Sequence, residues 1–313
     1  TGLKEKNISG LGRELELTIN TSPDSTQYSF GLIEPHVLNK RLDFIFGANF
    51  QDVDYTKASS YNLTSFNTNT GFRYLLSDDL NHSITLEYVL KDYKITNSTT
   101  AAKSIKDLSG TNADILLKNR LVYDKLDSFI RPSSGRFISY LNVLSPVTNS
   151  DNGYLKNLVT YKNYFNYDST IFSFHSKLGN ITSLQNSAIP EDNKFALGGY
   201  WLRGFDSFGV GPRNSRTSYV GGNNIVVTKF DLSRPVFKNS DNPIDLNLFF
   251  DAGTIFGNKT TPTNSKESWR SSYGLGIKFY TPIGPIGFSW AFPVTSENYD
   301  IERMFLFSIG NLN

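Results

Sequence analysis

The residues of this sequence with the clearest capacity for chemistry are one arginine and the glycines around it. Arg203 lies in the stretch GGYWLRGFDSFGVGP, residues 198 to 212. Glycine adopts backbone conformations that are closed to other residues, so a loop of this composition can fold back into a confined space. The guanidinium carries a permanent charge on a planar fork that can donate two parallel hydrogen bonds to a carboxylate. We therefore expect carboxylates to be the partners of Arg203.

Alternation of apolar and polar residues indicates which carboxylates these are. In VVTKFDLSRP, residues 226 to 235, the apolar side chains share one face and Asp231 falls on the other. In IDLNLFFDAG, residues 244 to 253, Asp251 falls on the polar face in the same way. Each aspartate has a second interpretation, as an ordinary solvated residue of a polar wall. A cation that meets both carboxylates would favour a specific site.

The same alternation runs through most of the chain and predicts strands. It is clearest where Tyr273, Leu275, Ile277 and Phe279 alternate with small or polar residues. Turn-forming sequences such as SPDST at 22 to 26 and TPIGP at 281 to 285 separate the segments. We expect roughly fourteen strands of about ten residues, which is the length that a tilted strand needs to cross a bilayer.

Composition excludes several classes of protein. The chain has 313 residues, a net charge of +2 and no cysteine, so disulfide frameworks and thiolate metal sites are excluded. The histidines lack metal-ligand spacing, and we expect no metal and no cofactor. Charges are interspersed, without the basic stripe that binds nucleic acid. We find no catalytic triad order, zinc motif or phosphate loop, and we expect no enzyme. The three histidines are His36, His82 and His175.

These features predict an all-β fold, a transmembrane antiparallel β-barrel, as a single domain over residues 1 to 313. No run of about 18 apolar residues is present, so the sequence predicts no transmembrane helix. Barrel strands escape hydropathy analysis because lipid-facing and lumen-facing side chains alternate along them. A soluble β-sandwich or propeller is the alternative. Strand length, aromatic residues near strand ends and charges opposite the apolar face favour the membrane barrel.

Several spaced motifs resemble BamA-type outer-membrane assembly factors. GGYWLRGF followed by GVGP is similar to their sixth extracellular loop, which has an arginine-glycine-aromatic tip. LVYDKLDSFIRPSSGRF is similar to a segment ahead of a central strand, and EKNISGLG to the hairpin end after the second strand. GGNNIVVTKFDLSRPVF, LNLFFDAGTIFG and YGLGIKFYTPIGPIGFSWAFPV match, in order, the strands before the last. On this resemblance the tip is Arg203, Gly204 and Phe205, and the loop hinges are Gly198, Gly199, Gly209 and Gly211.

The resemblance implies a barrel of the family's sixteen-strand type in the bacterial outer membrane. It places the acidic partners of the loop arginine on Asp231 and Asp251, the same residues that alternation indicates. We thus expect Arg203 to hold the loop against the inner wall. Counted against the family pattern, the chain starts within the second strand, so we expect it to lack the first strand and the upstream periplasmic POTRA domains. Asn313 stands where the family has a terminal aromatic residue.

The implied function is insertion and folding of other β-barrel proteins in the outer membrane. Weak pairing between first and last strands would let a client strand add to an exposed edge. The expected gate strand, residues 302 to 312, contains Phe305, Phe307, Ile309 and Gly310, and the glycine is either a bulge or a point of weak edge pairing. Expected partners are unfolded outer-membrane clients, the lipid bilayer and periplasmic accessory lipoproteins, without nucleic acid. The alternatives are a two-partner-type secretion pore, a translocation factor like TamA and a passive porin.

Overall fold

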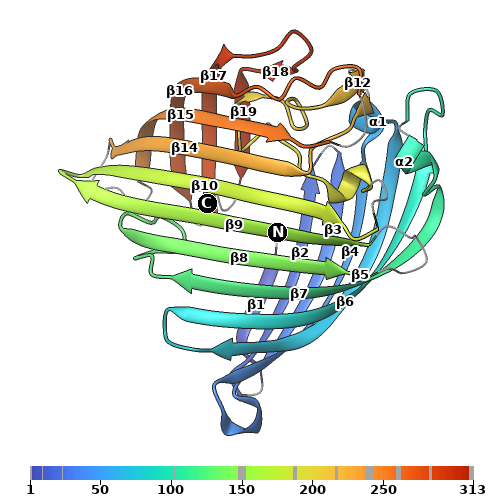
Figure 1. Ribbon diagram of the computed structural model, residues 1–313. Helices are drawn as coiled ribbons and strands as arrows, with labels where there is room; N and C mark the ends of the chain where they lie inside the picture. The colour runs from blue at the N-terminus through green and yellow to red at the C-terminus, as the bar shows by residue number, and fades with distance from the viewer. Residues whose placement is uncertain are drawn as a thin grey trace.

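The structure is a computed structural model. It describes residues 2–8, 10–22, 24–101, 103–146, 153–185, 189–215, 218–236, 243–258, 262–281 and 284–309. Fifteen strands form one antiparallel sheet, which curls into the wall of a barrel (Figure 1). The strands of this sheet are β1 (Gly2–Ile8), β2 (Arg13–Ser22), β3 (Ser25–Glu34), β4 (Leu42–Asp54), β5 (Tyr61–Leu75), β6 (Leu80–Ile95), β7 (Gly110–Asp124), β8 (Gly135–Ser145), β9 (Tyr154–Tyr167), β10 (Thr170–Ser183), β14 (Asn224–Pro235), β15 (Ile244–Phe256), β16 (Arg270–Thr281), β17 (Gly284–Thr295) and β19 (Phe305–Ile309).

Short elements lie in the connections between these strands. Two of the four short strands, β11 and β18, pair with each other, and so do β12 and β13. Among the described residues, no helix is long and apolar enough to cross a membrane. The short elements are η1 (Val37–Asn39), α1 (Thr56–Ser59), α2 (Lys103–Lys106), η2 (Glu191–Asn193), β11 (Gly204–Phe205), β12 (Arg213–Ser215), β13 (Ser218–Tyr219) and β18 (Glu302–Arg303).

The prediction of an all-β antiparallel barrel is confirmed, but the strand count and lengths differ from expectation. The main sheet has 15 strands instead of fourteen. Its strands range from the 5 residues of β19 to the 16 residues of β6. Alternation identifies a strand but marks its ends poorly, because the ladder continues through turn-rich sequence wherever the neighbouring strand supplies hydrogen bonds. Within the described residues the two edge strands, β1 and β19, do not pair with each other.

Register across neighbouring strands separates an apolar outer face from a polar inner one. Phe230 lies opposite Phe250, and Phe250 opposite Tyr273, and all three side chains are exposed. One position along, Lys229 lies opposite Asp251 and is buried with it. Successive residues of a strand point to opposite faces. One register therefore aligns both the exposed aromatic side chains on the outer face and the buried charged side chains on the inner face. The outer row suits lipid, and the inner row faces the lumen.

Antiparallel order divides the barrel into two ends. The connections from β10 to β14 and from β17 to β19 lie at one end, which we call the loop end. The connections from β9 to β10 and from β14 to β15 lie at the other, which we call the turn end. Side chains from different connections can contact one another only where those connections lie at the same end.

The connection from β10 to β14 folds into the barrel. Its residues 189–223, which we call the lumen loop, contribute Leu197, Leu202, Phe205 and Val210 to a buried apolar cluster. Side chains from β6, β7, β8, β9, β10, β14 and β15 complete this cluster. Burial of apolar area stabilises the loop in place, at roughly 25 cal/mol per Å² removed from water. The lumen is therefore filled by packed side chains at this level.

Candidate functional site

Arg203 lies at the tip of the lumen loop and bonds two carboxylates at once. Its Nε and Nη2 donate to Oδ2 and Oδ1 of Asp251 at 2.7 and 2.6 Å. Its Nη1 and Nη2 donate to Oδ1 and Oδ2 of Asp231 at 2.8 and 3.0 Å. The backbone N–H of Arg203 also donates to Asp251, at 3.1 Å. The structure thus brings Arg203 of the loop together with the two aspartates that alternation placed on a common face, and we call these three residues the arginine cluster.

The wall positions the two aspartates through strand register. Asp231 lies opposite Phe249, and Asp251 lies two residues further along β15, so the carboxylates sit diagonally across two neighbouring strands. The guanidinium fits between them over the Phe249 ring, with its carbon 3.5 Å from the ring centroid. Opposite Phe249 on β16 is Gly274, where a Cβ would come within 2.4 Å of the ring. The glycine therefore leaves the space that this ring occupies.

Burial makes the arginine cluster a strong electrostatic unit. Arg203, Asp231 and Asp251 are 5%, 7% and 0% exposed. Burial by itself lowers the pKa of Arg203, but the charges of Asp231 and Asp251 and their hydrogen bonds outweigh it and raise that pKa above the ordinary value. The guanidinium accordingly stays charged. Removing one partner would leave an unpaired charge buried away from water. This costs much more free energy of unfolding than breaking an ion pair at the surface.

Neighbouring polar groups complete the hydrogen bonding of the cluster. Ser272 on β16 donates through Oγ to the carbonyl oxygen of Arg203. The Nδ2 of Asn247 donates to Oδ1 of Asp231 at 3.0 Å. Lys229 donates from Nζ to the carbonyl of Tyr200 at 2.5 Å. Sequence reasoning did not assign these residues to the site, although alternation places Lys229 and Asn247 on the inner face, and this shared face is the signal that could have found them.

The glycines of the loop permit its tight course. Gly198 has φ +132°, and a Cβ there would lie 1.9 Å from the carbonyl oxygen of Asp206. At Gly209 a Cβ would lie 2.5 Å from the carbonyl oxygen of Ile301. Gly199 and Gly211, with positive φ, lie in the same loop. No other residue type would fit at Gly198 without moving the backbone.

The loop tip is also bonded to the segment that precedes the last strand. β11 pairs with β18, so Gly204 and Phe205 lie opposite Arg303 and Glu302. The amide of Ile301 donates to Gly209 at 2.9 Å. The expected gate strand is therefore divided: residues 302 and 303 pair with the loop, and β19, with Phe305, Phe307 and Ile309, pairs with β17. The strand was predicted as continuous because period-two alternation does not specify the partner. Gly310 lies outside the described residues.

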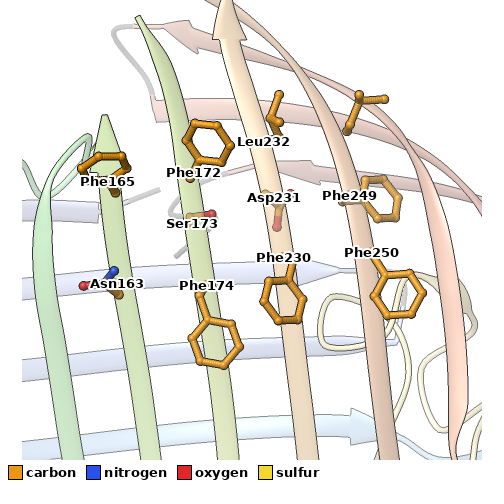
Figure 2. A pocket seen from close by; sticks show the side chains of 11 residues that line it. Asn163, Phe165, Phe172, Ser173, Phe174, Phe230, Asp231, Leu232, Phe249 and Phe250 are labelled. Atoms are coloured by element: carbon orange, nitrogen blue, oxygen red, sulfur yellow. The ribbon is translucent and has the colours of Figure 1, made fainter. Parts of the chain in front are cut away.

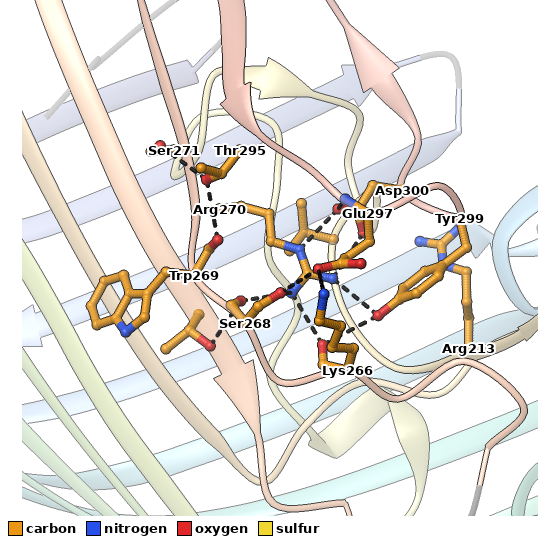
Figure 3. A network of polar contacts seen from close by, with 12 residues as sticks. Arg213, Lys266, Ser268, Trp269, Arg270, Ser271, Thr295, Glu297, Tyr299 and Asp300 are labelled. Carbon is orange, nitrogen blue, oxygen red and sulfur yellow. Dashed lines mark hydrogen bonds and ion pairs between the residues drawn. The ribbon is translucent and has the colours of Figure 1, made fainter.

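A second buried arginine joins the connections at the loop end (Figure 3). Arg270, the first residue of β16, donates from Nε to Oδ2 of Asp300 at 2.8 Å, and their side chains are 2% and 0% exposed. Its Nη2 reaches the hydroxyl of Tyr299 at 3.1 Å, and its Nη1 reaches the carbonyl of Ser268 at 2.6 Å. We call this group the rim network. Sequence reasoning missed it, because neither Arg270 nor Asp300 belongs to a motif.

The other side of the lumen loop is held by the opposite wall. Asp192 in η2 accepts from Nζ of Lys91 at 2.5 Å and from the hydroxyl of Tyr93 at 2.9 Å, both on β6. Nζ of Lys156 on β9 donates to the carbonyl of Asn193 at 2.8 Å. The loop thus spans the lumen from β6 and β9 to β14, β15 and β16. In the part of the chain that the structure describes, no three metal-ligating side chains group together.

Comparisons with known proteins agree with this architecture. Residues 7–312 match the family model of the Omp85 superfamily domain. The outer membrane protein assembly factor BamA of Neorickettsia risticii is 24% identical over 290 residues, which are 90% of this chain and 38% of that protein. The sorting assembly machinery 50 kDa subunit of Saccharomyces cerevisiae is 29% identical over 252 residues, which are 75% of this chain and 51% of that protein. The chain thus spans about half or less of the length of these relatives.

Solved structures show the same fold. BamA from Haemophilus ducreyi lacking POTRA domains 1–3 aligns with a TM-score of 0.84 and 21% identity, over 98% of this chain and 65% of that one. CdiB from Acinetobacter baumannii aligns with a TM-score of 0.62 and 13% identity, over 98% of this chain and 54% of that one. The protein is located in the bacterial outer membrane. The chain belongs to the Omp85 superfamily, and its barrel is of the BamA type.

Proposed function

We propose that this chain is the single barrel domain, residues 1 to 313, of a factor that inserts and folds other β-barrel proteins in the outer membrane. The observation that carries the proposal is the connection between the arginine cluster and the sheet edge. The loop tip that Arg203 fixes to β14 and β15 is hydrogen-bonded through β11 and β18 to the residues directly before β19. The loop would thereby set the position of the last strand.

The edge at β19 supplies the surface on which a client would act. β19 pairs with β17, and its other edge has no partner among the described residues. An unpaired backbone group in lipid costs several kcal/mol, so an open edge favours a strand that can satisfy it. A client strand would add there by β-augmentation, and its backbone hydrogen bonds would satisfy the N–H and C=O groups of that edge. The process needs neither covalent chemistry nor a nucleotide, so we propose no enzymatic activity.

The filled lumen argues against a passive porin. The lumen loop is packed in an apolar cluster and bonded to opposite walls, so a large and stable water-filled channel would require its removal. A dedicated secretion pore and a TamA-like translocation factor remain the alternatives, and the shared barrel does not distinguish them from a general assembly factor. We propose periplasmic accessory lipoproteins as partners at the turn end.

Depletion and rescue of the full-length protein in its source cell test the proposal. The amounts of several unrelated outer-membrane barrels are measured after depletion. A general assembly factor predicts that all of them fall together and recover on rescue. Loss of one secreted passenger, with the other barrels unchanged, would identify a dedicated pore and refute the proposal.

A further inference from the structure

The outer face of the barrel carries an apolar groove with one cation at its turn end. The groove has a volume of about 490 Å³ and lies over β14, β15, β16 and β17. Its lining includes Leu232, Leu248, Leu275 and Trp290, which are opposite one another in register and 36% to 56% exposed. Its volume falls within the range of about 300 to 1,000 Å³ that is typical of small-molecule sites.

Arg234 is the only charged side chain in that lining. It is the penultimate residue of β14 and lies opposite Leu246, one row closer to the turn end than Leu232. Its side chain is exposed on the outer face, and no carboxylate of the described residues forms an ion pair with it. A long cationic side chain at this depth can lay its stem along apolar surface and place its head at the membrane interface.

A second hollow continues the groove toward the middle of the membrane. It has a volume of about 400 Å³ and shares Leu232 and Leu248 with the first. Figure 2 shows Phe174, Phe230 and Phe250 in one row across β10, β14 and β15, which is the row that follows Leu232 and Leu248 away from the turn end. The outer wall thus offers a cation at the interface followed by two apolar rows of increasing depth.

We propose that this groove binds a glycerophospholipid, with its phosphate on Arg234 and an acyl chain along the two apolar rows. Phosphate matches the guanidinium fork in charge and geometry, and a charge-assisted contact of this kind is stronger than a neutral hydrogen bond. From the turn end inward, the groove presents Arg234, then the leucine row, then the phenylalanine row. A phospholipid has the same order, with its phosphate at the interface and its acyl chain deeper in the membrane. The site depends on the membrane location of the barrel and is independent of the proposed assembly activity.

Native mass spectrometry of the full-length protein, titrated with two lipids, tests this site. Dioleoyl phosphatidylglycerol carries the phosphate, and dioleoylglycerol has the same chains without it. The wild type should prefer the phospholipid by about tenfold, in keeping with a charge-assisted contact. Arg234→Gln should abolish that preference. Leu275→Trp, which fills the groove without changing charge, should weaken retention of both lipids.

Arg136→Gln is the matched control. Arg136 is exposed at the turn end of β8, on the same outer face, and does not line the groove. It should leave the preference for phosphatidylglycerol unchanged. Equal losses in Arg136→Gln and Arg234→Gln, or a preference that survives in Arg234→Gln, would show unspecific annular lipid and overturn the proposal. Heat-modifiable mobility on gels verifies that each variant is folded, and both arginine substitutions lie at exposed positions.

Discussion

The wall that holds Arg203 and the edges of the sheet are built in contrasting ways. β14 and β15 have 12 and 13 residues, pair with a neighbour on both sides and carry two buried carboxylates that share hydrogen bonds from one guanidinium. β19 lies at an edge of the sheet and pairs with one neighbour, β17, in the described chain. Backbone satisfaction and charge pairing thus concentrate in one part of the barrel, away from the edge where, in the function we propose, a client strand would add.

This contrast indicates how one barrel can combine a firmly paired wall at β14 and β15 with an edge that lacks a partner strand. A membrane barrel gains most from complete pairing, because unpaired groups in lipid are costly. Here the lumen loop connects the well-paired wall to the residues before β19, so the stable region can position the weakly paired one. The following variants test that connection, from the largest expected effect to the smallest.

Replacing Arg203 by alanine should have the largest effect. It leaves Asp231 and Asp251 buried without their cation, and we expect a loss of about 3 to 5 kcal/mol in the free energy of unfolding. The measurement is thermal or urea unfolding in detergent, followed by heat-modifiable gel mobility. Arg303→Ala, which removes an exposed ion pair with Asp206, is the control and should cost about 0 to 1 kcal/mol. Equal effects of the two substitutions would contradict a buried arginine cluster.

Replacing Arg270 by alanine should have the next largest effect. It leaves the buried Asp300 carboxylate of the rim network without its cation, and we expect a loss of about 3 kcal/mol in the free energy of unfolding. Limited proteolysis between residues 296 and 304 should become faster, because this segment loses its contacts with β16. Lys266→Ala, which removes a largely exposed ion pair with Glu297, should leave that cleavage rate near the wild-type value.

Combining the substitutions of Arg203 and Arg270 shows whether the two sites act together. Both contact the short segment before β19, one through β11 and β18 and the other through Asp300. Residues of one network typically show interaction energies of about 0.5 to 3 kcal/mol in a double-mutant cycle. Strict additivity of the two losses would argue that the loop and the rim network hold β19 independently.

Gly198→Ala should cost about 1 to 3 kcal/mol, since it forces a non-glycine residue into a strained conformation. Its Cβ would meet the Asp206 carbonyl, so the loop tip must shift away from the wall. Gly31→Ala is the matched control, because a Cβ at Gly31 meets only the Glu16 side chain at 3.9 Å. Thermal unfolding compares the two, and a wild-type midpoint for Gly198→Ala would refute the predicted strain.

The smallest expected effect is a difference in amide hydrogen exchange between two strands of the wild-type protein. Amides of β19 should exchange about tenfold or more faster than those of β14, because edge strands open at lower free energy than central ones. Mass spectrometry of peptides from the two strands provides the measurement. Equal protection in both strands would remove the contrast between wall and edge.

The sequence was sufficient for those features that depend on neighbouring residues in the chain. Period-two alternation is a local property of a strand, so it identified the all-β fold, the two faces of the wall and the inward direction of Asp231 and Asp251. The glycine-rich stretch around Arg203 marked the loop that could reach them. Strand ends were less accurate, because the neighbouring strand decides how far a ladder continues.

The tertiary structure alone decided which distant segments meet above and outside the strands. Arg270 and Asp300 are separated by a whole hairpin, and Asp192 finds Lys91 across the lumen. β18 pairs with β11, far back in the chain, because the lumen loop places that tip beside it. The groove beside Arg234 needs four strands in one register. Such contacts follow from the curvature and register of the wall, and no local pattern of residues encodes those.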